Sequence, residues 1–378
     1  MSRHLHIISF DVPYPPNYGG VIDVYYKLFW LNKLGIKVHL HCFQYGRNKA
    51  PQLEALCEKV YYYPRKTGLL SNLSIEPYTV VSRKNAELEN NLLKDGHPIL
   101  FEVLHTCYLL NDPRFASRKK IFRHSNIEHE YYRELAGTEK NFFKKNFLKM
   151  EAFKLERFEK IVNKANVIMA VNQKDAGYFL HKYPHPRTIY LPSFHAAEKV
   201  NSLTGTGPYI LFHGNLGISE NYEAALWLIS NVFSKIHNHT LIAGLNPPGF
   251  LKTEVAKHTN IKLIENPSQD EMNGLIQKAH IHVLFTPQPT GLKLKLLNVL
   301  FAGRFIVCNS HMLSGTGLVQ NNGLKIADTA EQYISLINSL SDTPFSESEI
   351  ISREASCAAF SNQNNAGRLV DEIFGTSS

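Results

Sequence analysis

Residues 281–309 read IHVLFTPQPTGLKLKLLNVLFAGRFIVCN and contain a complete strand–helix–strand unit. The runs IHVLF (281–285) and RFIVCN (304–309) are short and apolar, as buried strands are. Between them, apolar residues recur at helical spacing and predict a helix over residues 292–302. Two buried strands joined by a helix favour a parallel sheet, because parallel neighbours need a long crossover connection.

The same alternation of strands and helices continues through most of the chain. We predict further strands at residues 6–10, 37–43, 59–64, 99–104, 120–124, 166–171, 209–214, 239–244, 261–265 and 323–327. The main further helices are expected at residues 21–34, 130–163, 221–233, 269–278 and 347–374. This pattern is typical of α/β proteins with doubly wound, Rossmann-like parallel sheets, whose ligands bind at the carboxyl ends of the strands.

A short polar segment divides the chain into two parts of similar size. Residues 201–208 contain glycine and proline and predict a linker. We therefore expect one doubly wound domain over residues 1–200 and a second over 201–355, with a helical segment at 356–378. The pattern alone does not assign that last segment to either domain.

Composition narrows the class of protein. The chain has 378 residues, of which 44% are hydrophobic, enough for two sizeable cores. No run approaches the roughly 20 apolar residues of a membrane span, and the first residues do not resemble a secretory leader. The five cysteines are scattered, without a metal-binding CxxC pair. We expect a reduced, cytoplasmic protein.

The net charge of +8 is concentrated in one stretch. Residues 140–164 carry eight basic and three acidic side chains, interleaved with phenylalanines at helical spacing. One interpretation is an amphipathic helix with a core-facing apolar side and a solvated basic side. The other adds attraction to an anionic membrane surface or a polyanionic substrate. Nucleic acid is not an expected partner, because no nucleic-acid-binding motif accompanies the charge.

Two lysines at the start of the helix 292–302 require an explanation, because cations there oppose the helix dipole. The backbone amides of Gly291 and Leu292, together with Lys293 and Lys295, would make a strong site for a diphosphate. Lysines two residues apart cannot share one helical face, so we expect Lys295 to reach the phosphates and Lys293 to face solvent. Asn298 lies one turn beyond Lys295 and is expected to hold ribose hydroxyls.

Two glycine-containing loops follow predicted strands. PYPPNYGG places Gly19 and Gly20 at the start of a helix, where backbone amides could approach a ligand. It is not the GxGxxG pattern of dinucleotide-binding proteins, and a rigid strand-to-helix connection is the alternative. HGNLGISEN places His213, Gly214 and Asn215 at the carboxyl end of the first predicted strand of the second domain, where we expect them to contact the diphosphate. We expect a serine or asparagine of this loop, at 219 or 221, to cap the following helix.

These motifs, together with SNIEHEYY (125–132) and TGLKLKLLNVLFAG (290–303), make the chain similar to the family-4 retaining glycosyltransferases. The resemblance covers nearly the whole chain. It implies a GT-B fold, with two Rossmann-like domains facing each other across a cleft. The second domain would bind a nucleotide-sugar donor and the first an acceptor, without a metal ion or other cofactor. The last helix would pack back on the first domain.

Three residues are candidates for a catalytic role. His105 follows a predicted strand at its carboxyl end, while His124 and Glu128 belong to the segment RHSNIEH. None of the histidines considered stands four residues from another on a helix with a carboxylate, so we predict no metal site.

The chain departs from the family pattern at two places. Thr290 and Asn298 occupy the positions of two glutamates that many relatives carry. We keep both residues in the predicted donor site, but neither can supply a carboxylate. In the segment RHSNIEH, Ser125 stands where relatives have a histidine, and His124 lies one residue earlier. A shift of one residue on a strand reverses the face. The sugar specificity of the family therefore does not transfer.

The resemblance and the residues together predict a transferase. It would move a sugar, with retention of configuration, from a nucleoside diphosphate to a hydroxyl of a glycan or a lipid-linked saccharide. It would act in the cytoplasm, either free or bound to the inner face of the membrane. Two alternatives stay open: a nucleotide-sugar 2-epimerase of the same architecture, and a non-catalytic, transferase-like binding subunit.

Overall fold

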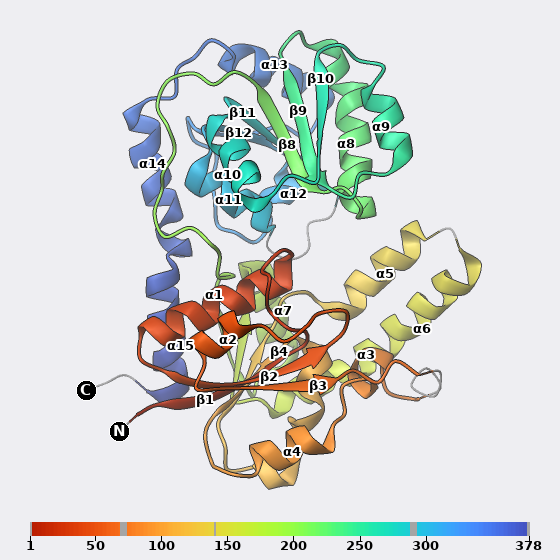
Figure 1. Cartoon of the computed structure of the whole chain (residues 1–378), viewed down its shortest axis with the longest axis vertical. Coiled ribbons are helices and arrows are strands. Elements are labelled where there is room, and N and C mark those ends of the chain that lie inside the picture. Colours follow the sequence, from red (N-terminus) through yellow and green to blue (C-terminus); the bar gives the residue numbers. More distant parts are fainter. Residues whose placement is uncertain (1, 69–73, 140, 288–292, 376–378) are drawn as a thin grey trace. The chain divides into compact units, whose positions relative to one another are not determined.

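The protein is described by a computed structural model covering residues 2–68, 74–139, 141–287 and 293–375 (Figure 1). Contacts between residues divide these into two compact units. Unit 1 contains residues 2–194 and 362–375, and unit 2 contains residues 195–287 and 293–361. Each unit is built on one parallel sheet flanked by helices.

The sheet of unit 1 has seven strands in the order β3-β2-β1-β4-β5-β6-β7. Every neighbouring pair is parallel. The strands are β1 (His4–Ser9), β2 (Lys37–Gln44), β3 (Lys59–Pro64), β4 (Ile99–Glu102), β5 (Lys120–Arg123), β6 (Val167–Ala170) and β7 (Arg187–Tyr190).

Alternate residues along these strands enter two hydrophobic clusters, one on each face of the sheet. Ile7 of β1 packs with α1 (Gly19–Lys33) and α15 (Asn362–Phe374), whereas Ile8 packs with α4 (Ala86–Leu92), α6 (Phe142–Phe158) and α7 (Gln173–Lys182). The remaining helices of unit 1 are α2 (Pro51–Leu56), α3 (Tyr78–Val81), η2 (Leu104–Leu109), η3 (Pro113–Phe115), α5 (Glu128–Thr138) and η4 (Glu159–Lys164), where η marks a 3-10 helix.

The sheet of unit 2 has six parallel strands in the order β10-β9-β8-β11-β12-β13. The strands are β8 (Ile210–Asn215), β9 (Thr240–Leu245), β10 (Ile261–Glu265), β11 (Ile281–Leu284), β12 (Phe305–Cys308) and β13 (Leu324–Ile326). The helices are α8 (Ser219–Asn231), η5 (Phe233–Lys235), α9 (Gly249–Val255), α10 (Gln269–Lys278), α11 (Leu294–Ala302), α12 (Ser310–Leu313), α13 (Ala330–Leu340), α14 (Glu347–Cys357) and η6 (Ala358–Phe360). The predicted fold class, two doubly wound parallel α/β sheets, is confirmed.

The strand orders locate the edge of each sheet at which a ligand would bind. In unit 1 the chain winds outward from β1 through β2 and β3, and then continues on the other side with β4. In unit 2 the same reversal separates β8 from β11. Open α/β sheets bind their ligands at such reversals, beyond the carboxyl ends of the strands.

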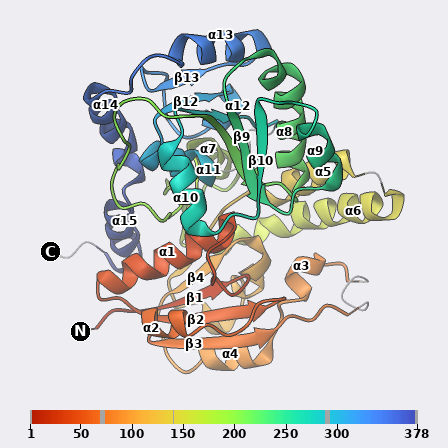
Figure 2. The ribbon, with the colours of Figure 1, turned by 45° about the horizontal axis from the view of Figure 1, so that its top comes forward.

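Two long predicted helices are each interrupted in the structure. The prediction for residues 130–163 is wrong, because α5 ends at Thr138 and α6 begins at Phe142, after the side chain of Asn141 accepts a hydrogen bond from the backbone N–H of Lys144. The two helices run side by side (Figures 1 and 2). Likewise, residues 347–374 form α14, η6 and α15, and α15 packs against α1 within unit 1.

The cysteines and the length of the helices bear on the class of protein. The five cysteines are free thiols, and all but Cys57 are buried. Within the residues that the structure describes, no helix is both long enough and apolar enough to cross a membrane.

Candidate functional site

The carboxyl edge of the unit 2 sheet is formed where β8 and β9 end side by side. Gly214 of β8 is paired with Gly244 of β9. A Cβ atom on Gly244 would lie 1.8 Å from the carbonyl oxygen of Gly214, so only glycine allows this approach. Just beyond this pair, the backbone N–H of Gly217 donates to the carbonyl oxygen of Leu245 at 3.1 Å and holds the loop after β8 to the end of β9.

The first turn of α8 follows this loop and carries two polar residues into the site. The helix has no side-chain cap, so the prediction of a cap from residue 219 or 221 is wrong. Asn221 instead donates its amide hydrogen to the carbonyl oxygen of Asn215, at 3.0 Å. Glu220, in the same turn, lies 2.6 Å from the hydroxyl of Thr286 beyond β11. The N–H groups of Asn221 and Tyr222 donate to the carbonyl oxygen of Ile218, and no side chain caps the start of the helix. Backbone N–H groups at a helix N-terminus are the partners that an anion prefers.

The two lysines of the opening stretch both reach α8. Lys293 donates to Glu220 at 2.9 Å, and its side chain is largely covered. Lys295 donates to the amide oxygen of Asn221 at 3.1 Å and to the carbonyl oxygen of Phe285 at 3.3 Å. The prediction that Lys293 faces solvent is wrong. Helix α11 begins at Leu294, so Lys293 precedes it in extended backbone, where the spacing rule for helical faces does not apply.

The surroundings of these groups set their charges. Burial lowers the pKa of Lys295 to about 8. The negative charge of Glu220 acts in the opposite direction and raises this pKa, whereas the positive charge of Lys293 lowers it further. Burial would raise the pKa of Glu220, but Lys293 and the hydroxyl of Thr286 outweigh it and hold that pKa below its usual value. At neutral pH the site therefore contains one ion pair and a second cation whose hydrogen bonds go to uncharged oxygens.

His213 lies deeper at the end of β8. Its side chain is only 4% exposed, and neither ring nitrogen has a hydrogen-bond partner among the described residues. Burial and the charge of Lys295 lower its pKa to about 3, so the ring is neutral. A buried polar group of this kind costs about 1–3 kcal/mol when unpaired, which favours a ligand or a water molecule as its partner.

The remaining predicted donor residues have these positions. Asn298 lies on α11, one turn after Lys295, and is partly exposed. Thr290, Gly291 and Leu292 lie outside the described residues.

In unit 1, a polar cluster holds the loop after β1, which carries the predicted ligand contacts Gly19 and Gly20 at its end. Tyr18 donates its hydroxyl to Asp11 at 2.8 Å, and Arg47 donates to the carbonyl oxygen of Pro15 at 2.8 Å. Gly19 and Gly20 are the first residues of α1. A Cβ atom on Gly20 would lie 2.5 Å from the ring of Phe10, whereas one on Gly19 would meet nothing within 4 Å.

Two of the three catalytic candidates come together at the carboxyl edge of unit 1. Nε2 of His105, on η2, lies 3.3 Å from a carboxylate oxygen of Glu128, the first residue of α5. The backbone that leads to His105 is strained, because Val103 has a φ of +58°, an outlier for a β-branched residue. Such strain costs on the order of 1–3 kcal/mol and tends to occur at functional sites.

His124 is not part of this pair. Its ring is buried against Phe179 of α7, and its Nε2 is 3.7 Å from a carboxylate oxygen of Asp175. Burial lowers the pKa of His124 to about 3, whereas it raises that of Asp175 to about 6. Within unit 1, His124 therefore lies among core side chains.

A fully buried charge network, which sequence reasoning missed, supports the same edge. Lys27 of α1 donates to Glu102 of β4 at 2.5 Å and to Asp23 at 3.1 Å. Arg123 of β5 donates to Asp23 at 3.2 Å and to the carbonyl oxygen of Leu191 at 2.5 Å. The two cations and two carboxylates balance, and they tie the carboxyl ends of β4 and β5 to α1. Four charges spread over 100 residues give no local sequence signal.

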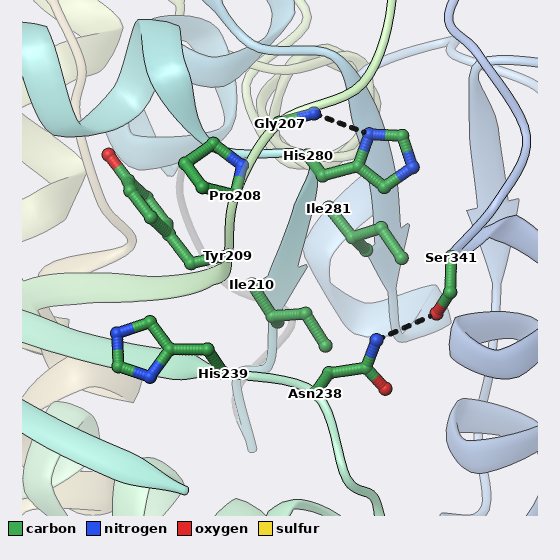
Figure 3. A pocket seen from close by; sticks show the side chains of 9 residues that line it. All are labelled: Gly207, Pro208, Tyr209, Ile210, Asn238, His239, His280, Ile281 and Ser341. Carbon is green, nitrogen blue, oxygen red and sulfur yellow. Dashed lines mark hydrogen bonds between the residues drawn. The ribbon is translucent and has the colours of Figure 1, made fainter.

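Two hollows of different character occur in the described parts of the two units. One, of about 440 Å³, lies in unit 1 beside the loops after β1 and β2, and is lined by polar residues including Tyr14, Arg47 and Lys49. The other, of about 60 Å³, lies in unit 2 at the amino ends of β8 and β11. There the ring of His280 accepts a hydrogen bond from the backbone N–H of Gly207, and the amide of Asn238 donates one to the hydroxyl of Ser341 (Figure 3). The second is at the wrong end of the strands for a ligand site of this fold.

Comparison with known proteins places this geometry in context. No protein-family model matches the chain. An uncharacterized 44.6 kDa protein in the cps region of Klebsiella pneumoniae is 25% identical over 343 residues, which are 85% of this chain and 87% of that protein.

Solved structures show the fold more clearly. A point mutant of TarM of S. aureus, bound to fondaparinux, alpha-GlcNAc-glycerol and UDP, aligns with a TM-score of 0.68 at 10% identity, covering 99% of this chain and 100% of that one. HepE of Anabaena, bound to UDP and glucose, aligns at 0.59 with 11% identity over 98% and 95% of the two chains. UGT89C1 of Arabidopsis thaliana, with UDP-L-rhamnose, aligns at 0.58 with 13% identity over 99% of both. The chain thus has two Rossmann-like domains of the GT-B type.

Proposed function

We propose that this protein is a glycosyltransferase that moves a sugar from a nucleoside diphosphate to a hydroxyl of a glycan or a lipid-linked saccharide, with retention of configuration. The observation that carries this proposal is the cationic site at the reversal between β8 and β11. Lys295 is a largely covered cation with direct hydrogen bonds only to the uncharged oxygens of Asn221 and Phe285 among the described residues. A diphosphate would supply a direct anionic partner for this lysine, which Glu220 attracts without a hydrogen bond between the two side chains among the described residues.

The donor would be held mainly by groups of unit 2. Lys295 and the uncapped first turn of α8 would meet the diphosphate, with Lys293 released from Glu220 as a second cation. His213 would offer a neutral ring nitrogen, and Asn298 is the proposed ribose contact. As the bond to the sugar breaks, negative charge grows on the diphosphate, and preorganised cations stabilise it in that state. The leaving diphosphate would then accept the proton of the acceptor hydroxyl.

The acceptor would be bound by unit 1. The polar hollow beside the loops after β1 and β2 offers Arg47, Lys49 and Tyr14 as hydrogen-bonding groups for a saccharide. His105 and Glu128 form the proposed pair that orients the reacting hydroxyl. The cps-region protein of Klebsiella pneumoniae supports a role in polysaccharide assembly.

Helix α6 suits a lipid-linked acceptor. Phe142 and Phe143 at its start are 71% and 84% exposed, and Phe153 is also exposed. Lys144 and Lys145 follow directly. Exposed aromatic rings beside lysines favour the surface of an anionic bilayer. Our proposal is therefore a cytoplasmic protein that binds peripherally to the inner face of the membrane through α6.

The residues at two donor positions support one alternative function. Asn298 is uncharged where many family-4 enzymes carry a glutamate, as is Thr290, so a binding subunit without transferase activity is the second candidate. A 2-epimerase would use the same diphosphate site.

The decisive experiment is a thermal-unfolding panel with UDP, GDP, dTDP, ADP and CMP, followed by an assay with the matching sugar nucleotide and a lipid-extract acceptor. A ligand at 100 times its Kd stabilises by about 2.7 kcal/mol, which raises the Tm of a domain of this size by roughly 5–10 °C. We expect one diphosphate to give this shift and its sugar nucleotide to yield new glycan. A shift without new glycan would favour the binding subunit, an epimerised sugar would favour the epimerase, and no shift would contradict the donor site.

A further inference from the structure

Five histidines gather on one face of the unit 1 sheet, near the amino ends of β1 and β2. His4 and His6 alternate along β1, as His39 and His41 do along β2, and His97 lies in the loop before β4. Because alternate residues of a strand point to the same face, the four strand histidines form a ladder across two neighbouring strands. The register pairs His6 with His39.

The inner part of this ladder is hydrogen-bonded within the protein. Nε2 of His6 donates to Asp95 at 3.0 Å, and its Nδ1 accepts from Nε2 of His41 at 2.9 Å. Nδ1 of His41 accepts from the hydroxyl of Tyr63 at 2.9 Å, which in turn accepts from Asn91 at 3.0 Å. Both ring nitrogens of His6 and of His41 therefore have hydrogen-bond partners within the protein. These two buried rings stabilise the fold and offer no lone pair to a ligand.

The outer three histidines are arranged differently. His4, His39 and His97 are partly exposed, and one ring nitrogen of each lies within 4.8 Å of the other two. His4 and His39 meet edge to edge, with Nδ1 of His4 at 3.0 Å from Nε2 of His39. Two imidazole nitrogens at this distance share one proton, and a cation that replaces the proton can bind both lone pairs.

We propose that His4, His39 and His97 bind a divalent transition-metal ion, with Zn²⁺ as the expected occupant. Tetrahedral coordination at a Zn–N distance of about 2.0–2.1 Å places ligand nitrogens roughly 3.3 Å apart. Nδ1 of His4 and Nε2 of His39, at 3.0 Å, are already near this spacing, and the ligand nitrogen of His97, within 4.8 Å of the others, needs to approach by at most about 1.5 Å. The ring planes are nearly parallel, at 24°, 14° and 12° to one another, so the partly exposed side chains also have to rotate until each lone pair faces the ion. Water would complete the coordination.

Neighbouring groups suit this occupant. Nε2 of His4 lies 3.0 Å from the hydroxyl of Ser2, so its N–H can donate outward while Nδ1 faces the metal, as second-shell partners of zinc ligands do. Asp95 accepts from the backbone N–H of His97 at 3.0 Å and holds the loop that carries this ligand. Arg118 is paired with the same carboxylate, Asp95, at 3.3 Å.

The ion would act as a clamp on the fold. It would join β1, β2 and the loop that enters β4 at the amino ends of the strands, opposite the edge that carries His105 and Glu128. The site therefore belongs to stability rather than to the proposed transfer reaction.

The test uses the full chain, stripped of metal with a chelator and titrated with ZnCl₂ in a calorimeter. We expect one equivalent to bind, and the substitutions His39→Gln and His97→Gln each to weaken binding at least tenfold. His185→Gln, at an exposed position elsewhere in unit 1, is the matched control and should bind as the original chain does. Circular dichroism of each variant checks that the fold is kept.

A second measurement reports on geometry independently of affinity. Co²⁺ in place of Zn²⁺ should give the strong visible absorption of a tetrahedral site, and His39→Gln should abolish it. The proposal is overturned if the original chain binds no equivalent of Zn²⁺, if both variants keep its affinity, or if Co²⁺ gives only the weak bands of an octahedral ion. None of these readouts depends on transferase activity.

Discussion

Lys295 is the central cation of the proposed donor site because its environment leaves its charge only partly compensated. Lys293, two residues away, is offset by Glu220 at 2.9 Å, whereas Lys295 has carbonyl and amide oxygens as its direct partners. A cation in a low-dielectric site attracts an anion more strongly than the same cation in water. The two lysines should therefore differ in their effect on binding.

We predict that Lys295→Ala weakens diphosphate binding more than Lys293→Ala. A hydrogen bond to a charged group contributes about 1.5–3 kcal/mol, so the loss of Lys295 should lower the affinity about ten- to a hundredfold. Lys293→Ala removes a cation that must first leave Glu220, and should cost less. Calorimetry with the responsive nucleoside diphosphate measures both, and equal losses would show that the two lysines act alike.

The lowered pKa of Lys295 also predicts a pH dependence. A bound diphosphate favours the charged lysine and raises its pKa, so binding is strongest while Lys295 is already protonated in the free protein. Since the free pKa is about 8, the affinity should be constant below pH 8 and fall as the pH rises above it, by up to tenfold per pH unit.

Lys295→Arg is the control for this effect, because arginine stays charged throughout this range. The variant should bind more weakly at pH 7, since its fork has a different shape, yet keep that affinity to pH 9.5. A parallel decline in both proteins would assign the titration to another group.

Among the elements of unit 2, the β8–β9 pair depends on the glycine at its carboxyl end. Gly244→Ala would force its methyl group against the backbone of Gly214, which cannot move without breaking the strand pairing. We expect a loss of stability of at least 3 kcal/mol and weakened nucleotide binding. Gly274→Ala in α10 has open space around it and should be neutral or slightly stabilising. Thermal unfolding of both variants tests this, and an equally stable Gly244→Ala protein would contradict the steric argument.

Helix α6 provides a prediction about membranes. The double substitution Phe142→Ser, Phe143→Ser should reduce sedimentation with liposomes of anionic lipid at low salt, because it removes the two most exposed rings of this helix. Lys144→Glu with Lys145→Glu should reduce it further and remove the salt dependence. Phe250→Ser, an exposed phenylalanine in unit 2, serves as the control. Absence of any preference for anionic over neutral lipid in the original chain would exclude α6 as the docking surface.

At the scale of the whole molecule, unit 1 is completed by α15, a helix far away in the sequence. Leu369, Val370 and Ile373 enter the same hydrophobic cluster as Val24 and Leu28 of α1. We predict that Leu369→Ala lowers the free energy of unfolding by about 2–5 kcal/mol. Gln363→Ala, on the exposed side of α15, should leave it within about 0.5 kcal/mol. Chemical denaturation measures both, and similar effects would show that α15 does not stabilise the core.

Much of this architecture could be predicted from the sequence, because buried parallel strands are continuous apolar runs. The predicted strands overlap β1 to β6 and β8 to β13, whereas β7, with the sequence RTIY, was missed since it has one aliphatic residue in four. The break before α6 was also missed. Apolar residues at helical spacing lie on both sides of it, Tyr131 and Leu135 before and Phe143 and Phe147 after, and no proline stands between them. The signal for a new helix is Asn141, which caps the start of α6.

The site was less accessible to such reasoning. The prediction located the two lysines and the loop after β8, but not Glu220, because an acidic residue in the first turn of a helix ordinarily complements the dipole. The buried pairing of Lys27 with Glu102, 75 residues apart, also depends on tertiary contacts. The histidine ladder was missed for a related reason. Metal ligands were sought at helical spacing, whereas His4 and His39 lie on separate strands.

The membership of α15 in unit 1 has a consequence for protein synthesis. The ribosome makes all of unit 2 after residue 194 and before residue 362. While those residues are being translated, the apolar side chains of α1 that pack with Leu369 and Ile373 lack these partners. Unit 2 can fold as it emerges, but the first unit to be made is the last to be finished. Nascent unit 1 is therefore the stage at which we expect chaperones to bind.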